Sequence, residues 1–358
     1  MVHVELKRRG VELRQAFNQI ERYQRDSFWY SSGLFNYVQI FVISNGTYTK
    51  YYSNTTRYKH IEGRSVKKSQ SFEFTSYWAD QNNNGIFDLE DFARTFFSKR
   101  TLLNIITKYC IFTSEEDLLV MRPYQITATE KIINKLEIAN NYNKFGDIYA
   151  GGYIWHTTGS GKTLTSFKTA QIASELEYID KVLFVVDRKD LDYQTMKEYD
   201  KFKKDCANSN ANTKILEKQL SSSETKIIIT TIQKLDSFIK KNVEHSAYNK
   251  KVVFIFDECH RSQFGDMHKN IVKRFNKWVI FGFTGTPIFT QNAQTKKGIM
   301  QTTGQVFGDR LHTYTIVNAI NDKNVLPFRY EYVGRVDIKD NVKDEKVYKI
   351  DIEKAYDN

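Results

Sequence analysis

Short apolar runs alternate with amphipathic stretches through the middle of the chain. Four of these runs lie within residues 181–191, 226–235, 251–256 and 277–287, and they end in or lead into polar or small residues. Apolar runs of this length are typical of strands that are buried on both faces. Because helical patterns separate the runs, we expect βα units that form a doubly wound parallel sheet.

A fifth apolar run, residues 153–155, leads into the glycine-rich segment TGSGKT at residues 158–163. A helical pattern follows this segment. A strand, a glycine loop and a helix start form an anion site, because backbone N–H groups and the helix N-terminus face the phosphates. In this pattern Lys162 reaches the β- and γ-phosphates of ATP, and Thr163 holds Mg²⁺. The plain motif has glycine where this chain has His156.

Two carboxylates, Asp257 and Glu258, follow the apolar run that ends at Phe256. In open α/β sheets the carboxyl ends of the strands form the edge that binds ligands. One carboxylate can therefore orient a Mg²⁺ shell, and the next can orient the attacking water. Together with the phosphate loop, this pair predicts ATP and Mg²⁺ as cofactors.

The first residues of the chain alternate between apolar and polar positions. In VHVELK the apolar residues occupy positions 2, 4 and 6, so His3, Glu5 and Lys7 share the opposite face of a strand. A carboxylate two residues before a lysine forms half of a metal-dependent nuclease site. Glu5 would hold a divalent cation, and Lys7 would stabilise charge at the scissile phosphate or help to activate water.

An amphipathic helix is predicted over residues 11–28. Its expected buried residues are Leu13, Phe17 and Ile20. Gln19 and Tyr23 lie one turn apart on the same side of this helix. A strand–turn–strand hairpin is expected over residues 36–55, and the segments at residues 72–80 and 88–109 are expected to complete the domain. Residues 72–78 have a strand pattern.

The segment at residues 80–91 has some features of a calcium-binding loop. The side chains that match its positions 1, 3, 5, 6 and 12 are Asp80, Asn82, Asn84, Gly85 and Asp91. Position 12 should however be Glu, which binds Ca²⁺ through both oxygens, and a strand pattern rather than a helical pattern precedes the segment. An Asn-rich surface turn is therefore the favoured interpretation.

The composition fits two packed domains and points to the kind of partner. The 358 residues allow about two domains, and 41% hydrophobic residues exclude a largely disordered chain. A formal net charge of +11 favours a polyanion partner. No apolar run approaches the roughly 18 residues of a membrane span, and three cysteines without metal or disulfide spacing fit a cytoplasmic location.

In chain order, the segments RPYQ, TGSGKT, VVDRKDL, TTIQKL, DECH and TGTP resemble the first motor lobe of superfamily 2 helicases and translocases. The resemblance implies that the nucleotide-binding residues are Arg122, Tyr124, Gln125, Thr158, Gly159, Ser160, Gly161, Lys162, Thr163, Asp257 and His260. The first three would contact adenine, Thr163 and Asp257 would bind the metal, and Glu258 would position water. His260, Thr284 and Thr286 would couple hydrolysis to DNA, and residues 187–191 and 230–233 would lie near the DNA.

The segments ELKRRG and AFNQIERY, followed by these motor segments, resemble the endonuclease (R) subunit of type I restriction enzymes. By this resemblance the catalytic residues of the nuclease are Glu5, Lys7, Gln19 and Tyr23. The implied fold is α/β: a truncated PD-(D/E)xK-like nuclease domain (residues 1–112) and a RecA-like motor lobe with a doubly wound parallel sheet (113–328). Residues 329–358 would begin the connection to a second lobe.

The resemblance further implies an ATP-dependent DNA translocase and endonuclease that cleaves unmodified foreign duplex DNA. Its partners would be methylation and specificity subunits, with no membrane association. The family's nuclease has an essential Asp upstream of E-x-K, and no acidic residue precedes Glu5 here. We therefore expect a fragment with little activity of its own. The alternatives are another superfamily 2 DNA helicase and an inert ATP-binding piece.

Overall fold

The computed structural model describes residues 1–28, 33–63, 71–186, 213–262, 266–292, 295–296, 299–300 and 302–326. Residues Met1–Val325 form one compact unit. Three features of the sequence analysis lie outside the described residues: the predicted DNA-track segment at 187–191, Cys206 and the predicted connection at 329–358.

The first part of the chain forms a five-stranded sheet in the order β1-β2-β3-β4-β5. Its strands are β1 (Val2–Leu6), β2 (Ile40–Ser44), β3 (Thr49–Ser53), β4 (Ser76–Ala79) and β5 (Gly85–Ile86). β1 pairs with β2 in parallel, and the other neighbours are antiparallel. The predicted hairpin is therefore confirmed, and Gly46 in its turn has a φ of +83°, a conformation that favours glycine.

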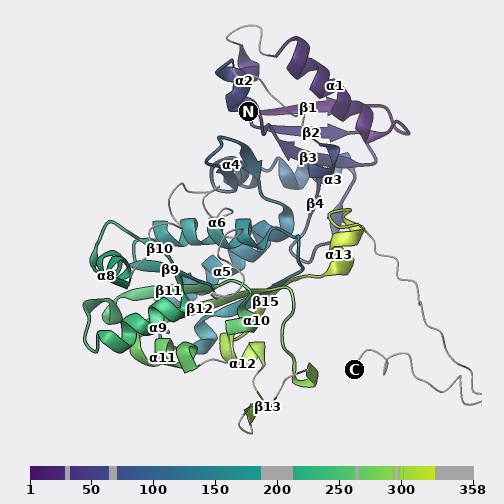
Figure 1. Cartoon of the computed structure of the whole chain (residues 1–358). Helices are drawn as coiled ribbons and strands as arrows, with labels where there is room; N and C mark the ends of the chain where they lie inside the picture. The colour runs from purple at the N-terminus through teal and green to yellow at the C-terminus, as the bar shows by residue number, and fades with distance from the viewer. Residues whose placement is uncertain are drawn as a thin grey trace, which may run out of the picture. The chain divides into compact units, whose positions relative to one another are not determined.

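Helices cover both faces of this sheet (Figure 1). α1 (Leu13–Asp26) confirms the predicted amphipathic helix, because Phe17 and Ile20 on its buried side pack against β2 and β3. α3 (Leu89–Phe96) and α4 (Lys99–Thr107) pack on the opposite face around Phe96. The alternation of side chains along β2 and β3 supplies both hydrophobic layers.

One predicted element is only partly correct. The strand expected over residues 72–78 starts as a 3-10 turn (Phe72–Phe74), because the Ser71 hydroxyl accepts a hydrogen bond from the Glu73 N–H at 3.3 Å and favours a tight turn. Residues 88–109, which are expected to complete the domain, contain the two helices α3 and α4. Asp88 caps the first helix, and a break at residues 97–98 precedes the second.

The described residues also form several short elements. They are α2 (Arg57–Ile61), β6 (Cys110–Phe112), β7 (Leu118–Val120), α10 (Cys259–Ser262), β13 (Thr295–Lys296), β14 (Ile299–Met300), α13 (Ile316–Asn321) and 3-10 turns at Leu34–Tyr37, Ile148–Ala150, Ser246–Asn249 and Thr290–Asn292. β6 and β7 form a hairpin, and the predicted domain boundary after residue 112 falls within it.

The second part of the chain forms a six-stranded sheet in the order β10-β9-β11-β12-β8-β15. Its strands are β8 (Gly152–His156), β9 (Lys181–Val186), β10 (Ile227–Thr231), β11 (Lys251–Phe256), β12 (Lys277–Thr284) and β15 (Arg310–Tyr314). Every neighbouring pair is parallel. The prediction of a parallel sheet is confirmed.

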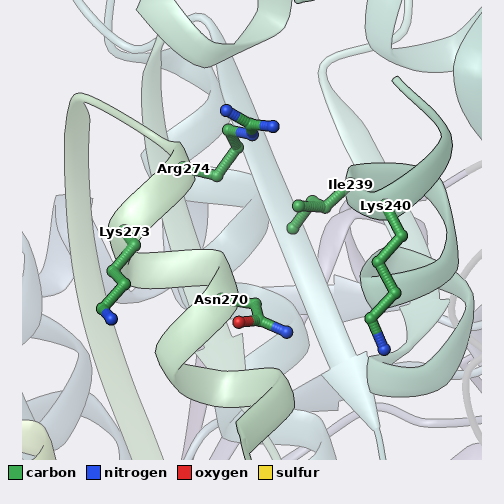
Figure 2. A pocket seen from close by; sticks show the side chains of 5 residues that line it. All are labelled: Ile239, Lys240, Asn270, Lys273 and Arg274. Atoms are coloured by element: carbon green, nitrogen blue, oxygen red, sulfur yellow. The ribbon is translucent and has the colours of Figure 1, made fainter. Parts of the chain in front are cut away.

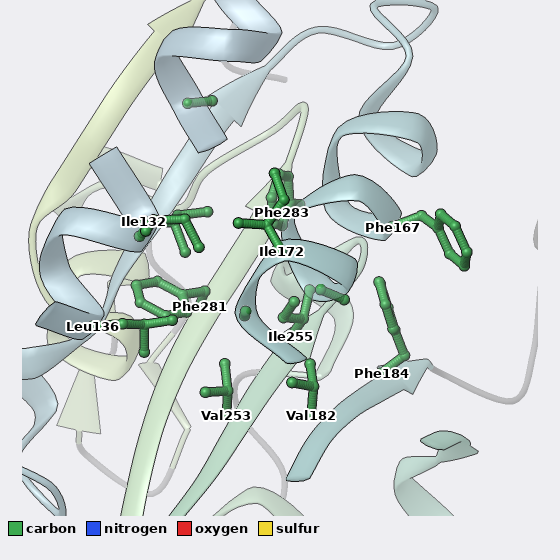
Figure 3. Packing of buried hydrophobic residues seen from close by; sticks show 14 of the residues in the cluster. Ile132, Leu136, Phe167, Ile172, Val182, Phe184, Val253, Ile255, Phe281 and Phe283 are labelled. Carbon is green, nitrogen blue, oxygen red and sulfur yellow. The ribbon is translucent and has the colours of Figure 1, made fainter. Parts of the chain in front are cut away.

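Helices also cover both faces of the parallel sheet, as a doubly wound fold requires. α5 (Pro123–Asn141) and α6 (Lys162–Glu175) pack on one face, where Figure 3 shows Ile132 and Phe167 with Val253, Ile255 and Phe281 of the strands. The other face is covered by α8 (Thr213–Ser221), α9 (Ile232–Lys241), α11 (Asp266–Arg274) and α12 (Thr303–Phe307). Among the described helices, none combines the length and apolarity needed to cross a membrane.

Candidate functional site

The phosphate loop connects β8 to α6 at the carboxyl edge of the parallel sheet. β8 ends at His156 and α6 begins at Lys162. Between them, Gly159 and Gly161 have φ values of +79° and +77°, which residues with a side chain rarely adopt. A Cβ at residue 161 would also lie 2.7 Å from the Gln125 amide nitrogen. Both glycines are therefore favoured by the backbone conformation of the loop, and a side chain at residue 161 would in addition displace the Gln125 amide.

The structure brings the phosphate loop and the predicted acidic pair together. The Nζ atom of Lys162 lies 3.2 Å from Oε1 of Glu258, and the Lys162 side chain is only 7% exposed. Asp257 is also buried, and its carboxylate accepts a hydrogen bond from the Glu258 N–H at 3.0 Å. Glu258 has a φ of +43°, a left-handed conformation that turns the chain sharply after β11. A buried lysine facing a carboxylate at this edge is suited to binding phosphate.

His260 extends this group of side chains to the next strand. Its Nδ1 atom is 2.9 Å from the hydroxyl of Thr284 at the end of β12 and 3.5 Å from Oε2 of Glu258. The Thr284 hydroxyl also accepts a hydrogen bond from the N–H of Thr286. Burial lowers the pKa of His260, Glu258 opposes that shift and Lys162 adds to it. These contacts connect the acidic pair to the TGTP segment, as the motor resemblance implies.

Arg122, Tyr124 and Gln125 lie at the start of α5, beside the phosphate loop. The Tyr124 hydroxyl and the Gln125 amide both donate to the Ser160 carbonyl, at 2.7 and 3.1 Å. The Gln125 carbonyl in turn accepts from the Arg122 N–H at 2.9 Å. The polar ends of Tyr124 and Gln125 thus hold the phosphate loop, and their contact with adenine stays a prediction.

A cavity of about 890 Å³ opens beside these residues. Its lining includes Gln125 and the phosphate-loop residues 159–161, together with Tyr52 and Thr55 of the first domain. The cavity is therefore bounded by both parts of the described unit. Its position next to the phosphate loop is suitable for the base and sugar of a nucleotide.

The predicted nuclease residues also lie together in the structure. Lys7 Nζ is 2.9 Å from Glu5 Oε1 and donates to the Gln19 side-chain oxygen. The Gln19 amide then donates to the Tyr23 hydroxyl. His3 lies on the same face, with Nε2 3.9 Å from Glu5 Oε2. The shared face of β1 and the matching side of α1 are therefore both confirmed.

Two apolar residues on the other face of β1 are exposed rather than buried. Val4 is 39% exposed and Leu6 is 55% exposed. α3 and α4 cover that side of the sheet around Ile40, Val42 and Tyr51 of β2 and β3, not around the middle of β1. Position in the sheet, which sequence alternation does not reveal, decides this exposure.

The described side chains form no ready-made metal cluster. Within the described ranges, no three His, Cys, Asp or Glu residues come together in a way that could hold a metal ion. The metal roles of Glu5, Thr163 and Asp257 therefore stay predictions. At residues 80–91 the Asp80 carboxylate accepts from the Asn82 and Asn84 N–H groups, which confirms the Asn-rich turn.

A second cavity of about 350 Å³ lies between α9 and α11 (Figure 2). Its lining residues are Ile239, Lys240, Asn270, Lys273 and Arg274. Asp236 accepts from the Asn270 amide at 2.8 Å and pairs with Lys240 at 2.6 Å. The hydrogen bond to Asn270 links the two helices, and none of the predicted nucleotide residues lines this cavity.

The sequence analysis missed the contribution of β15 to the phosphate loop. Tyr314 stacks on Tyr124 with ring centroids 3.6 Å apart, and His312 Nδ1 is 2.9 Å from His156 Nε2. These residues are far apart in the sequence and become neighbours only because β15 pairs with β8. No local motif could have indicated them.

Two family models match the chain. The model described as "Type I restriction enzyme R protein N terminus" matches residues 1–60, and the model described as "SWI2/SNF2 ATPase" matches residues 124–358. The second match covers more than half of the chain and begins at the start of α5.

Curated relatives with names of type I restriction enzymes match nearly the whole chain. The SsaAORF53P endonuclease subunit of Staphylococcus saprophyticus is 46% identical over 340 residues, which is 94% of this chain and 34% of that protein. The C-terminal part of the MpnIIP endonuclease subunit of Mycoplasma pneumoniae is 50% identical over 204 residues, which is 55% of this chain and 99% of that protein.

Among solved structures, the type ISP restriction-modification enzyme LlaGI is 18% identical with a TM-score of 0.39, covering 57% of this chain and 20% of that chain. The fold assignment rests instead on the strand order of this chain. The chain spans about a third of the length of the staphylococcal relatives. Its sequence nevertheless places it plainly: the chain belongs to the endonuclease subunits of type I restriction enzymes and carries a SWI2/SNF2 ATPase domain.

Proposed function

We propose that this chain is the motor and nuclease portion of a type I restriction endonuclease subunit. The whole subunit would move along duplex DNA at the expense of ATP and would cleave unmodified DNA. The observation that carries the proposal is the 3.2 Å approach of Lys162 to Glu258, which joins the phosphate loop to the acidic pair at one edge of the sheet. The relatives' names, as endonuclease subunits, support the same activity.

The nucleotide site provides suitable residues for ATP and Mg²⁺. The loop backbone at residues 158–161 and the start of α6 would hold the phosphates, and Lys162 would exchange its contact with Glu258 for one with a phosphate oxygen. Thr163 and Asp257 would hold Mg²⁺, which supplies charge neutralisation at the transferring phosphoryl group. Glu258 would orient the attacking water, and His260 would connect Glu258 to Thr284.

The nuclease site would work through the contacts around Lys7. Glu5 would hold a divalent metal ion, and Lys7 would lie beside the scissile phosphate. Gln19 and Tyr23, which are joined to Lys7 by a continuous series of hydrogen bonds from α1, would position its side chain. The first domain would extend over residues 1–112, the motor lobe over 113–328 and the following connection over 329–358.

The partners follow from the family and from the charge of the chain. Type I restriction enzymes have separate subunits for methylation and for sequence specificity, and we propose these as protein partners of the whole subunit. Duplex DNA is the proposed substrate, since the net charge of +11 favours contact with a phosphate backbone.

Calorimetric titration of this chain with ATP and Mg²⁺ tests the nucleotide site. Lys162→Ala should abolish measurable binding, because the phosphate charge then faces no buried cation. Lys241→Ala removes an exposed lysine at the end of α9 and should leave the affinity within about twofold. Glu258→Gln should bind ATP as tightly as the unaltered chain or a few-fold more tightly, because Lys162 loses its competing carboxylate.

Two results would contradict this assignment. One is wild-type affinity in a folded Lys162→Ala variant, since phosphate binding would then not depend on the proposed loop. The other is a loss in Glu258→Gln as large as the loss in Lys162→Ala, since Glu258 would then support binding rather than compete for the lysine.

A further inference from the structure

Hydrogen bonds within the Asn-rich turn of the first domain, residues 80–84, fix its backbone conformation. The Asp80 carboxylate accepts from the backbone N–H groups of Asn82 and Asn84 at 2.8 and 2.9 Å and from the Asn84 amide at 2.8 Å. Asn83 has a φ of +66°, which asparagine tolerates better than most residues. The turn joins β4 to β5 and presents the Asn83 side chain outward from that hairpin.

Asn83 makes a direct contact with the parallel sheet of the motor lobe. Its amide nitrogen donates to the Thr313 carbonyl at 2.8 Å. β15 is the edge strand next to β8, so this carbonyl faces away from the sheet and needs a hydrogen-bond donor from outside the sheet. Burial lowers the pKa of the neighbouring residue, His312, and the main chain of Gln81 in the same turn partly opposes that shift. The Asn83–Thr313 hydrogen bond therefore joins this turn of the first domain directly to β15.

β15 carries this contact to the phosphate loop. His312 Nδ1 is 2.9 Å from Nε2 of His156, the last residue of β8, and the Thr157 N–H donates to the Tyr314 carbonyl at 2.9 Å. Both histidines are buried. Burial lowers the pKa of His156 well below its ordinary value and that of His312 to about 4, so the rings are neutral and one donates to the other.

A second connection runs through aromatic rings. Tyr314 stacks on Tyr124, whose hydroxyl donates to the Ser160 carbonyl within the phosphate loop. β15 therefore supports the loop at two places, at its start through residues 156–157 and at its centre through Ser160. A shift of β15 would change both supports together, because the strand is a single packed element.

We propose that the Asn-rich turn holds β15 against β8, so that the first domain sets how firmly the phosphate loop is held for nucleotide. Asn83 is then a positioning residue that acts through Thr313 and the His156–His312 pair. This inference rests on the proposed nucleotide binding, and it extends that function to control by the nuclease-like domain. Nucleotide binding should also stabilise the Asn-rich turn, because coupling between two sites is reciprocal.

A matched pair of substitutions in this chain tests the proposal. Asn83→Asp is isosteric but places a carboxylate against the Thr313 carbonyl, whereas Asn82→Asp introduces the same charge one residue away at an exposed position. Amide hydrogen exchange at residues 157–161 is measured without nucleotide. We expect exchange at least about fivefold faster in Asn83→Asp and unchanged within twofold in Asn82→Asp, because only the first loses the contact with β15.

The affinity for ATP and Mg²⁺ provides the second measurement. It should fall about tenfold in Asn83→Asp and stay within twofold of the unaltered chain in Asn82→Asp. Asn83→Gly removes the amide without adding charge and accepts the positive φ, so it serves if the Asp variant does not fold. His312→Leu should lower the affinity for ATP as much as Asn83→Gly does. His312→Asn should keep most of the affinity that His312→Leu loses, because the asparagine amide nitrogen lies near the Nδ1 position of histidine.

Unchanged exchange at residues 157–161 in folded Asn83 variants would overturn the proposal, and so would equal effects of the Asn82 and Asn83 substitutions. The proposed function fails separately. If the unaltered chain does not bind nucleotide, that function is wrong, whereas the exchange comparison without nucleotide still shows whether the turn supports the loop.

Discussion

Lys7 lies at the centre of the contacts in the first domain, between Glu5 and Gln19. Lys7→Ala in an intact endonuclease subunit should abolish DNA cleavage, because the cation beside the proposed scissile phosphate is lost, while ATP hydrolysis persists in a separate domain. The next residue provides the control. Arg8 is exposed, and Arg8→Ala should retain cleavage. Plasmid cleavage and phosphate release, measured on the same variant, test this prediction. Loss of both activities in a folded Lys7→Ala variant would contradict the assignment of cleavage and ATP hydrolysis to two separate sites.

His268 gives a prediction about pH at the scale of one side chain. It packs against Phe256 and Phe307, and burial lowers its pKa to about 4. The unfolded chain takes up this proton near pH 6.5, so the free energy of unfolding should fall as the pH drops from about 6.5 toward 4. His268→Leu removes this contribution. The variant should lose about 1 kcal/mol less stability than the unaltered chain between pH 7 and 5.5.

Urea unfolding at the two pH values measures that difference. Using the change with pH, rather than stability at one pH, separates the titration from the effect of repacking leucine in the core. Equal pH dependence in both proteins would mean that His268 titrates normally in the folded state.

At the scale of elements, the sequence predicted what depends on local signals. The glycine loop and the apolar runs indicated β8, α6 and β11, because burial on both faces and a phosphate loop leave marks within a few residues. The exposure of Val4 and Leu6 depends on which part of the sheet the distant helices cover. The His156–His312 contact likewise depends on strand order, which no short segment of the sequence contains.

The stability of a helix N-terminus can depend on a single side chain that caps it. Asp88 caps α3 by accepting from the Glu90 N–H at 2.8 Å, whereas Ser98 makes no such backbone cap for α4. Asp88→Ala should therefore lower the free energy of unfolding by about 1 kcal/mol. Ser98→Ala should change it by less than about 0.5 kcal/mol. Urea unfolding of both variants tests this, and a larger loss in Ser98→Ala would show that the cap bond does not determine the stability of these helices.

At the scale of the whole molecule, the charge of the chain predicts how its affinity for DNA should depend on salt. The formal net charge is +11. Binding through phosphate contacts releases counterions, so the logarithm of the affinity should fall linearly with the logarithm of the salt concentration, with a slope of about −0.9 for each contact. If four phosphates are contacted, raising the salt from about 50 to 200 mM should weaken binding on the order of 100-fold.

Fluorescence anisotropy with a labelled duplex measures this slope, and a second duplex of unrelated sequence serves as the control. Both duplexes should bind equally well, because we propose that base recognition belongs to a separate specificity subunit. Affinity that does not depend on salt would exclude the phosphate backbone as the main contact. A strong preference for one duplex would instead show that this chain reads bases, and sequence recognition would then have to be assigned partly to the motor and nuclease portion itself.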